Sequence, residues 1–265
     1  MKDNLYLVKG ESLRAIPLPK ETRTYKPVSH SQLIDLTLES IHSAGFELNS
    51  SEYTAARDGK VANGKFAIKN VADKEMQLQI GWQNSYDKSL SLKFAIGTKI
   101  FICSNGCVNG DYGAFKKKHQ GEVKEFAPKA IIDYIKRAGD AFTRMQEERE
   151  AMKEIEVTRR VQAELIGRMI VENKFIESTQ LNIIRDELEH PSHDYGAPGS
   201  LWELYQFTTF AMKEVHPSLW MSNHIDAHEF FVNASGMERK PLYEPAVQLE
   251  LFPELVVDGL AEVQG

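Results

Sequence analysis

Two cysteines are the first residues in this chain whose type and spacing could do chemistry. Cys103 and Cys107 form a C-x3-C pair around Ser-Asn-Gly. A structural zinc site needs four ligands, and the nearest further candidate is His119. Free cysteine is usually a small buried side chain, so packing explains the pair without a metal. We therefore predict no metal site and no cofactor at these cysteines.

Two pairs of histidines are the next candidates. His224 and His228 lie four residues apart, so a helix would present both on one face, as a metal site requires. His190 and His193 share a polar loop with an aspartate and a tyrosine, which is a possible acid–base set. A metal-dependent enzyme that uses these histidines is one alternative. The chain has no G-x-x-x-x-G-K-[ST], G-x-G-x-x-G, G-x-S-x-G or H-E-x-x-H motif, so we assign no catalytic residue.

Basic residues in the middle of the chain favour binding over catalysis. The candidate nucleic-acid-binding residues are Lys93, Lys99, Tyr112, Phe115, Lys116, Lys117, Lys118 and His119. Lysines on one surface neutralise phosphates, and aromatic rings stack on single-stranded bases. A solvated sheet face whose edge lysines block aggregation explains the same pattern, so both interpretations stay open.

Composition limits the class of protein. The chain has 265 residues, 42% hydrophobic and 26% charged, which is ordinary for a globular fold. No apolar run is long enough for a membrane helix, and two cysteines fit a reducing compartment, so we expect a cytoplasmic protein. Residues 1–137 carry net positive charge and 138–265 net negative charge, which suggests different partners for the two halves.

The periodicity predicts an α+β fold with an N-terminal helix, an antiparallel β-meander and a mostly helical C-terminal half. Ser29 or Ser31 starts the first helix and Gly45 ends it. Alternating segments at 66–68, 76–82, 90–96 and 100–102 predict strands, separated by Asn-Gly, Asp-Lys and Gly-Thr turns. Pro128 suits a helix start, and 127–175 is one long helix or two. The expected segments are 1–27 (irregular), 28–125 (sheet domain), 126–239 (helical) and 240–265 (acidic tail).

Two motifs resemble a known family. They are Asn84-Ser85-Tyr86-Asp87-Lys88-Ser89, followed by Cys103-x-Asn105-Gly106, and later Leu201-Trp202-x-Leu204-Tyr205. The pattern resembles the phage/plasmid-like proteins of bacteriophages and mobile elements, a domain of unknown function, over most of residues 80–235. Tyr86 stands where that family usually has histidine, and Lys88 where it has glycine. No catalytic histidine is therefore implied; Asn84, Ser85, Asp87, Asn105 and Gly106 are types that favour turns.

The resemblance implies a phage or mobile-element protein in a bacterial host cell. The expected order of elements also resembles phage single-strand annealing proteins, by analogy of fold alone. Together with the basic cluster this gives our main hypothesis: a non-catalytic protein that binds single-stranded DNA, plausibly for annealing or recombination. Its acidic half would mediate self-association or engage a partner. The further alternative is an inhibitor of host defence that binds a host protein.

Overall fold

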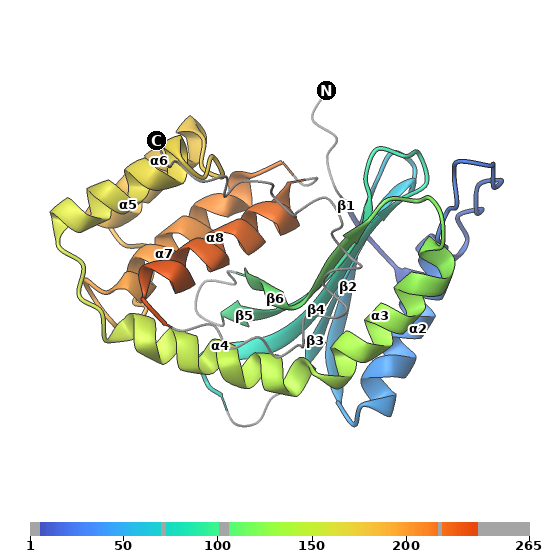
Figure 1. The fold of residues 1–265 in the computed structure, drawn as a ribbon, viewed down its shortest axis with the longest axis horizontal. Helices are drawn as coiled ribbons and strands as arrows, with labels where there is room; N and C mark the ends of the chain where they lie inside the picture. The colour runs from blue at the N-terminus through green and yellow to red at the C-terminus, as the bar shows by residue number, and fades with distance from the viewer. Residues whose placement is uncertain (1–5, 70–72, 101–105, 217–218, 238–265) are drawn as a thin grey trace, which may run out of the picture.

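The computed structural model describes residues 6–69, 73–100, 106–216 and 219–237, with the backbone alone described for 106–113 (Figure 1). Its centre is one six-stranded antiparallel sheet in which the strands follow one another in chain order. The strands are β1 (Tyr6–Val8), β2 (Leu48–Ala56), β3 (Val61–Ile68), β4 (Met76–Ser85), β5 (Leu92–Ile100) and β6 (Gly106–Lys117). The predicted meander is confirmed.

Helices cover the sheet and extend beyond it. They are α1 (Gly10–Arg14), α2 (His30–Ser43), α3 (Val123–Lys136), α4 (Ala138–Lys153), α5 (Arg159–Val171), α6 (Ser178–Glu189), α7 (Leu201–Ala211), the short 3-10 helix η1 (Met212–Glu214) and α8 (Trp220–Ala234). Figure 1 shows α2, α3 and α4 along one side of the sheet and α5 to α8 gathered at the other end of the molecule. The α+β class is confirmed.

The alternating strand residues form the core face of the sheet. Ile80, Trp82, Phe94 and Ile96 are fully buried, in one cluster with side chains of α2 and α3 such as Ile34. The same cluster continues into α7 and α8, so the sheet and the helical half share one hydrophobic core. Within the described residues, no helix is long and apolar enough to cross a membrane.

Two of the expected turns are wrong. Asn63-Gly64 lies inside β3, and Gly97-Thr98 lies inside β5, which continues through both residues to Ile100. Gly64 has a packing role: an ideal Cβ there would lie 2.6 Å from Trp82 Cε2. A glycine inside a strand often marks a place where another group approaches the backbone closely.

The helix boundaries also differ from expectation. Ser29 caps α2 as predicted, because its hydroxyl accepts a hydrogen bond from the Gln32 backbone N–H, and Gly45 follows the helix with φ 79°. The span 127–175 holds three helices rather than one or two, and α3 begins at Val123, so Pro128 lies inside it. Burial of Val123 and Ala127 extends α3 before the proline.

The N-terminal segment 1–27 is not wholly irregular, because it contains β1 and α1. β1 pairs with β2, an arrangement that three residues of local sequence do not reveal. Residues 240–265, the expected acidic tail, lie outside the described residues.

Candidate nucleic-acid interface

The turn between β4 and β5 carries the first predicted motif, and hydrogen bonds within the motif hold it. Ser85 Oγ donates to the Leu90 carbonyl at 3.0 Å and accepts from the Leu90 N–H at 3.1 Å. Asp87 accepts from the Ser89 N–H at 3.0 Å and pairs with Arg57 at 2.9 Å. These bonds hold the pKa of the Asp87 carboxyl below its usual range. Ser85 and Asp87 therefore shape the turn, as their types predicted.

Asn84 is buried behind this turn and ties the sheet to the start of α2. Its amide N–H group donates to the Val28 carbonyl at 2.8 Å and lies 3.0 Å from His30 Nδ1. The other ring nitrogen of His30 lies 3.1 Å from the Gly59 carbonyl. Asn84 is fully inaccessible to solvent, so it cannot touch a ligand in this conformation.

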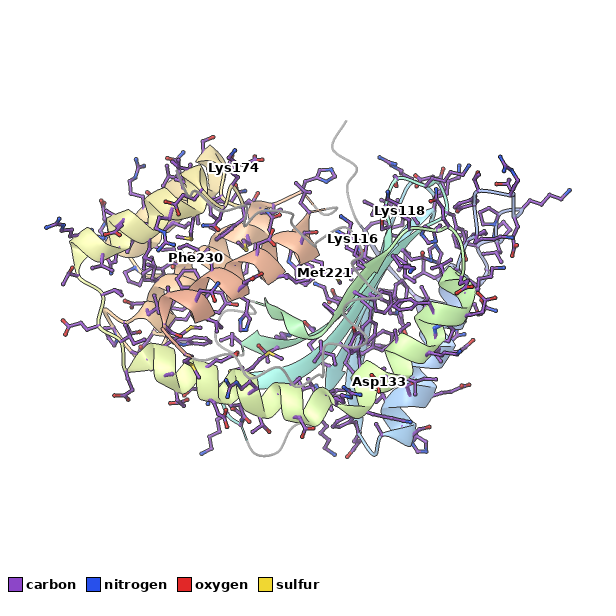
Figure 2. The ribbon with its side chains drawn as sticks, in the orientation of Figure 1. Lys116, Lys118, Asp133, Lys174, Met221 and Phe230 are labelled. Carbon is purple, nitrogen blue, oxygen red and sulfur yellow. The ribbon has the colours of Figure 1, made fainter. Side chains whose placement is uncertain are left out.

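Cations gather at one end of the sheet, which we call the basic end. Here the β2–β3 turn, the β4–β5 turn, the end of β6 and the loop before α2 meet (Figure 1). Its members are Arg23, Lys26, Arg57, Lys60, Lys88, Lys116, Lys117 and Lys118. Figure 2 places Lys116 and Lys118 together there, with Lys174 on the opposite side of the molecule. An antiparallel meander returns alternate turns to the same end, which is why residues so far apart in sequence converge.

A pocket of about 310 Å³ opens within the basic end. Its lining residues come from three separate segments: Thr24, Tyr25, Lys88, Ser89, Leu90, Ser91, Lys118, His119 and Gln120. The structure thus brings the motif residue Lys88 beside two of the predicted nucleic-acid-binding residues, Lys118 and His119. Our sequence reasoning missed Thr24 and Tyr25, which lie in a segment without periodicity.

Lys93 does not lie on an exposed face, contrary to our expectation. It is 6% exposed beneath the first turns of α8, and its ammonium donates to Ser222 Oγ at 2.9 Å. Burial, together with the neighbouring charge of Lys116, lowers the pKa of Lys93 to about 8. α8 packs against this part of the sheet, where Met221 contacts small side chains such as Ala95. The alternation that predicted the outward direction of Lys93 could not predict the helix that covers it.

The other predicted nucleic-acid-binding residues do not form one surface with the basic end. Phe115 is a core residue, stacked 5.8 Å from Phe94, so it is not available for base stacking. Lys99 lies near the far end of β5, paired with Gln77, away from the basic end. Lys117 sits 4.8 Å above the Phe126 ring. Tyr112 lies in β6, and its side chain is outside the described part of the structure.

The second part of the motif falls mostly outside the described residues. Cys103 and Asn105 lie there, and so does any contact they make. Gly106 is the first residue of β6, and Cys107 follows it opposite Thr98 of β5. The expected Asn105-Gly106 turn is thus described only from its second residue onward.

The predicted histidine set does not converge on a metal site. Among the described residues, no group of three or more histidine, cysteine, aspartate or glutamate side chains could hold an ion. His228 is buried instead between Tyr205 and Glu148, with ring nitrogens 3.0 Å from the Tyr205 hydroxyl and 3.1 Å from Glu148 Oε2. This polar bridge joins α4, α7 and α8 inside the helical half. It explains why a tyrosine ends the Leu-Trp-x-Leu-Tyr motif.

The fold and this site define a class: an α+β protein with a β-meander whose turns gather cations around a small polar pocket. The chain belongs to the family described as a domain of unknown function (DUF932), whose model matches residues 17–219. That range contains strands β2 to β6, the basic end and most of the helical half. Neither a curated protein nor a solved structure matches the chain.

Proposed function

We propose that this protein binds single-stranded nucleic acid at the basic end, without covalent chemistry. The observation that carries the proposal is the convergence of exposed lysines from separate loops, above all Lys88, Lys116 and Lys118. Within the described part of the chain, Lys88 and Lys118 make no ion pair with an acidic side chain. Unpaired ammonium groups on one surface can each neutralise a phosphate and release its counterion.

Two nearby carboxylates neutralise other cations of the basic end, Arg57 and Lys26, so the charge left to bind phosphate lies mainly on the remaining lysines. Asp87 pairs with Arg57, and Glu21 pairs with both Lys26 and Lys124. The finer parts of the proposal rest on resemblance: a role in annealing or recombination in phages and mobile elements, action in the cytoplasm of the host, and self-association.

Fluorescence anisotropy with a labelled single-stranded oligonucleotide tests the proposal. We expect binding at low salt that weakens as salt rises. A Lys116→Glu/Lys118→Glu variant should bind more weakly, with the slope of log K against log salt reduced by about 0.7 for each lost phosphate contact. The matched control is Lys136→Glu/Lys174→Glu, which makes the same charge change at exposed sites away from the basic end. No binding at low salt, or equal losses in both variants, would refute the proposal.

A further inference from the structure

A lysine and a serine that the proposed strand binding does not use meet where α8 covers the sheet. Lys93 Nζ donates a hydrogen bond to Ser222 Oγ at 2.9 Å. Lys93 is 6% exposed, whereas Ser222 is partly exposed and so can be reached from solvent. A serine hydroxyl within hydrogen-bond reach of a buried amine is the arrangement of a nucleophile and its general base.

The surroundings of Lys93 favour the neutral amine, which is the form that accepts a proton. Burial lowers the pKa of Lys93 to about 8, and the charge of Lys116, its cross-strand partner on β6, acts in the same direction. The Asp226 carboxylate on α8 opposes this shift, and the partner on β4 is the uncharged Gln83. A lysine that is desolvated beside another cation loses its proton near neutral pH more readily than an exposed lysine does.

The position of Ser222 in α8 favours negative charge beside its hydroxyl. It is the third residue of the helix, and the N-cap residue Leu219 has no polar side chain to cap the first turn. Backbone N–H groups in the first turn of a helix have no acceptor within that helix, and the helix dipole is positive at this end. Both effects stabilise an oxyanion that forms at a carbonyl carbon bound to Ser222.

A polar pocket of about 410 Å³ begins one helical turn after Ser222. Asp226 and Glu229 of α8 line it together with Asn173, which follows α5 (Figure 2, where Phe230 marks the pocket). Burial and then the charge of Glu229 raise the pKa of Asp226, so a positive group placed here would be stabilised. The volume lies within the range of small-molecule sites. The pocket therefore suits a polar substrate with a positively charged substituent.

We propose that Ser222 and Lys93 form a serine–lysine dyad that hydrolyses carboxylic esters. Lys93 Nζ accepts the Ser222 hydroxyl proton as Oγ bonds to the ester carbonyl carbon. The C–O bond to the alcohol then breaks, and the Lys93 ammonium returns the proton to the alcohol oxygen. Water adds to the acyl carbon as Lys93 accepts one of its protons, the acid departs, and Ser222 regains its proton from Lys93. This activity is separate from strand binding and does not depend on it.

A fluorophosphonate probe tests whether Ser222 is a nucleophile in the full chain. The serine oxygen displaces fluoride from phosphorus, and peptide mass spectrometry locates the adduct. We expect the adduct at Ser222, formed at a rate that rises with pH through about 8 as Lys93 loses its proton. Ser222→Ala should lose the adduct, and Ser43→Ala, at an exposed serine that ends α2, should keep it. No adduct at Ser222, or equal labelling of Ser43, would overturn the proposal.

Substitutions at Lys93 distinguish a general base from a lysine that only packs. Lys93→Arg keeps a positive donor that cannot lose its proton, so labelling and p-nitrophenyl acetate hydrolysis should each fall about 100-fold. Lys93→Met tests the same loss if arginine does not fit beneath α8, and circular dichroism checks that each variant is folded. Lys99→Arg, on the same strand and the same face, is the matched control and should keep both rates. Unchanged rates in a folded Lys93 variant would refute the dyad.

Discussion

Tyr86 lies flat against His30, with ring centroids 3.8 Å apart and planes 9° from parallel. The Tyr86 hydroxyl accepts a hydrogen bond from the His30 backbone N–H at 2.8 Å, and the Tyr86 carbonyl accepts from the Tyr25 hydroxyl at 2.9 Å. Tyr86 therefore connects the β4–β5 turn, the start of α2 and Tyr25, which lines the pocket at the basic end. A residue at the centre of the motif serves to position its neighbours.

The buried position of His30 predicts acid sensitivity. The hydrogen bonds place a proton on Nε2, facing the Gly59 carbonyl, and leave Nδ1 to accept from Asn84. Burial lowers the pKa of His30 from 6.5 to about 4. In the unfolded chain His30 therefore becomes protonated near pH 6.5, whereas in the folded chain it becomes protonated only near pH 4. Stability should fall as pH drops through this window, by at most about 3 kcal/mol.

Urea unfolding at several pH values between 7 and 4 measures this loss. His30→Gln should flatten the dependence, while His42→Gln, an exposed site on the same helix, should leave it unchanged. The stability of His30→Gln should still depend on pH to some extent, because burial also lowers the pKa of His119. An identical slope in wild type and His30→Gln would contradict the assignment.

Lys88 holds a backbone conformation that suits glycine. Its φ is 66°, in the left-handed region, where a side chain costs about 1 kcal/mol. Lys88→Gly relieves this strain but also removes the ammonium from the Tyr25 ring. Lys88→Ala removes the same ammonium and keeps a Cβ. We therefore expect Lys88→Gly to be more stable than Lys88→Ala by about 1 kcal/mol.

Thermal or urea denaturation of these two variants gives the comparison directly. Asp58, with φ 56° in the β2–β3 turn, offers an independent check through Asp58→Gly and Asp58→Ala. If alanine is as stable as glycine at position 88, the turn does not carry the strain that its φ indicates.

Gly64 is required for the packing of Trp82. A Cβ at position 64 would lie within 2.6–2.8 Å of the indole ring, so Gly64→Ala must displace a fully buried tryptophan. Overpacking of this kind costs about 1–3 kcal/mol. Gly81 is the matched control on the next strand, because its Cβ would meet nothing closer than 3.7 Å.

The midpoint of urea unfolding measures both substitutions. Gly64→Ala should lower the midpoint clearly, and Trp82 fluorescence should shift as the ring moves. Gly81→Ala should change the midpoint little. Equal effects of the two variants would show that strand propensity, and not contact with Trp82, governs these positions.

Asp73 and Arg149 form a buried ion pair that fastens the segment before β4 to α4. Arg149 Nη1 contacts both carboxylate oxygens, at 3.0 and 2.9 Å, and the Asp73 carboxylate also accepts from the Glu75 and Met76 N–H groups. These bonds outweigh burial and lower the pKa of Asp73 to about 2. Its stabilising contribution is therefore complete above pH 4 and is lost as pH falls toward 2.

Asp73→Ala should lower the free energy of unfolding by about 3 kcal/mol. The reason is that Arg149 stays buried and loses the carboxylate that pairs with its charge. Adding Arg149→Met should recover part of this loss. Glu47→Ala breaks an exposed pair with Lys69 and should cost less than about 1 kcal/mol. The free energies of unfolding of these three variants test the predicted contribution of the buried pair. A double variant less stable than Asp73→Ala would contradict it.

Local patterns predicted the elements better than their boundaries. Alternation identified the strands because each one buries a single face, as Ile80 and Trp82 show. Glycine misled us, since Gly64 and Gly97 lie within strands, where a close neighbour and not a turn explains the first of them. The site was only partly predictable: Lys118 and His119 were identified as basic residues, but nothing local indicated that Tyr25 and Lys88 lie beside them.

The sequence alone determined the α+β class, the meander and a surplus of lysine in the first half, because these follow from periodicity and composition. Tertiary structure alone decided which of those lysines are accessible. It buried Lys93 under α8 and placed Phe115 in the core, while it gathered Lys88, Lys118 and His119 around one pocket. The reason is physical: exposure depends on what packs against a side chain, and that partner is usually distant in the sequence.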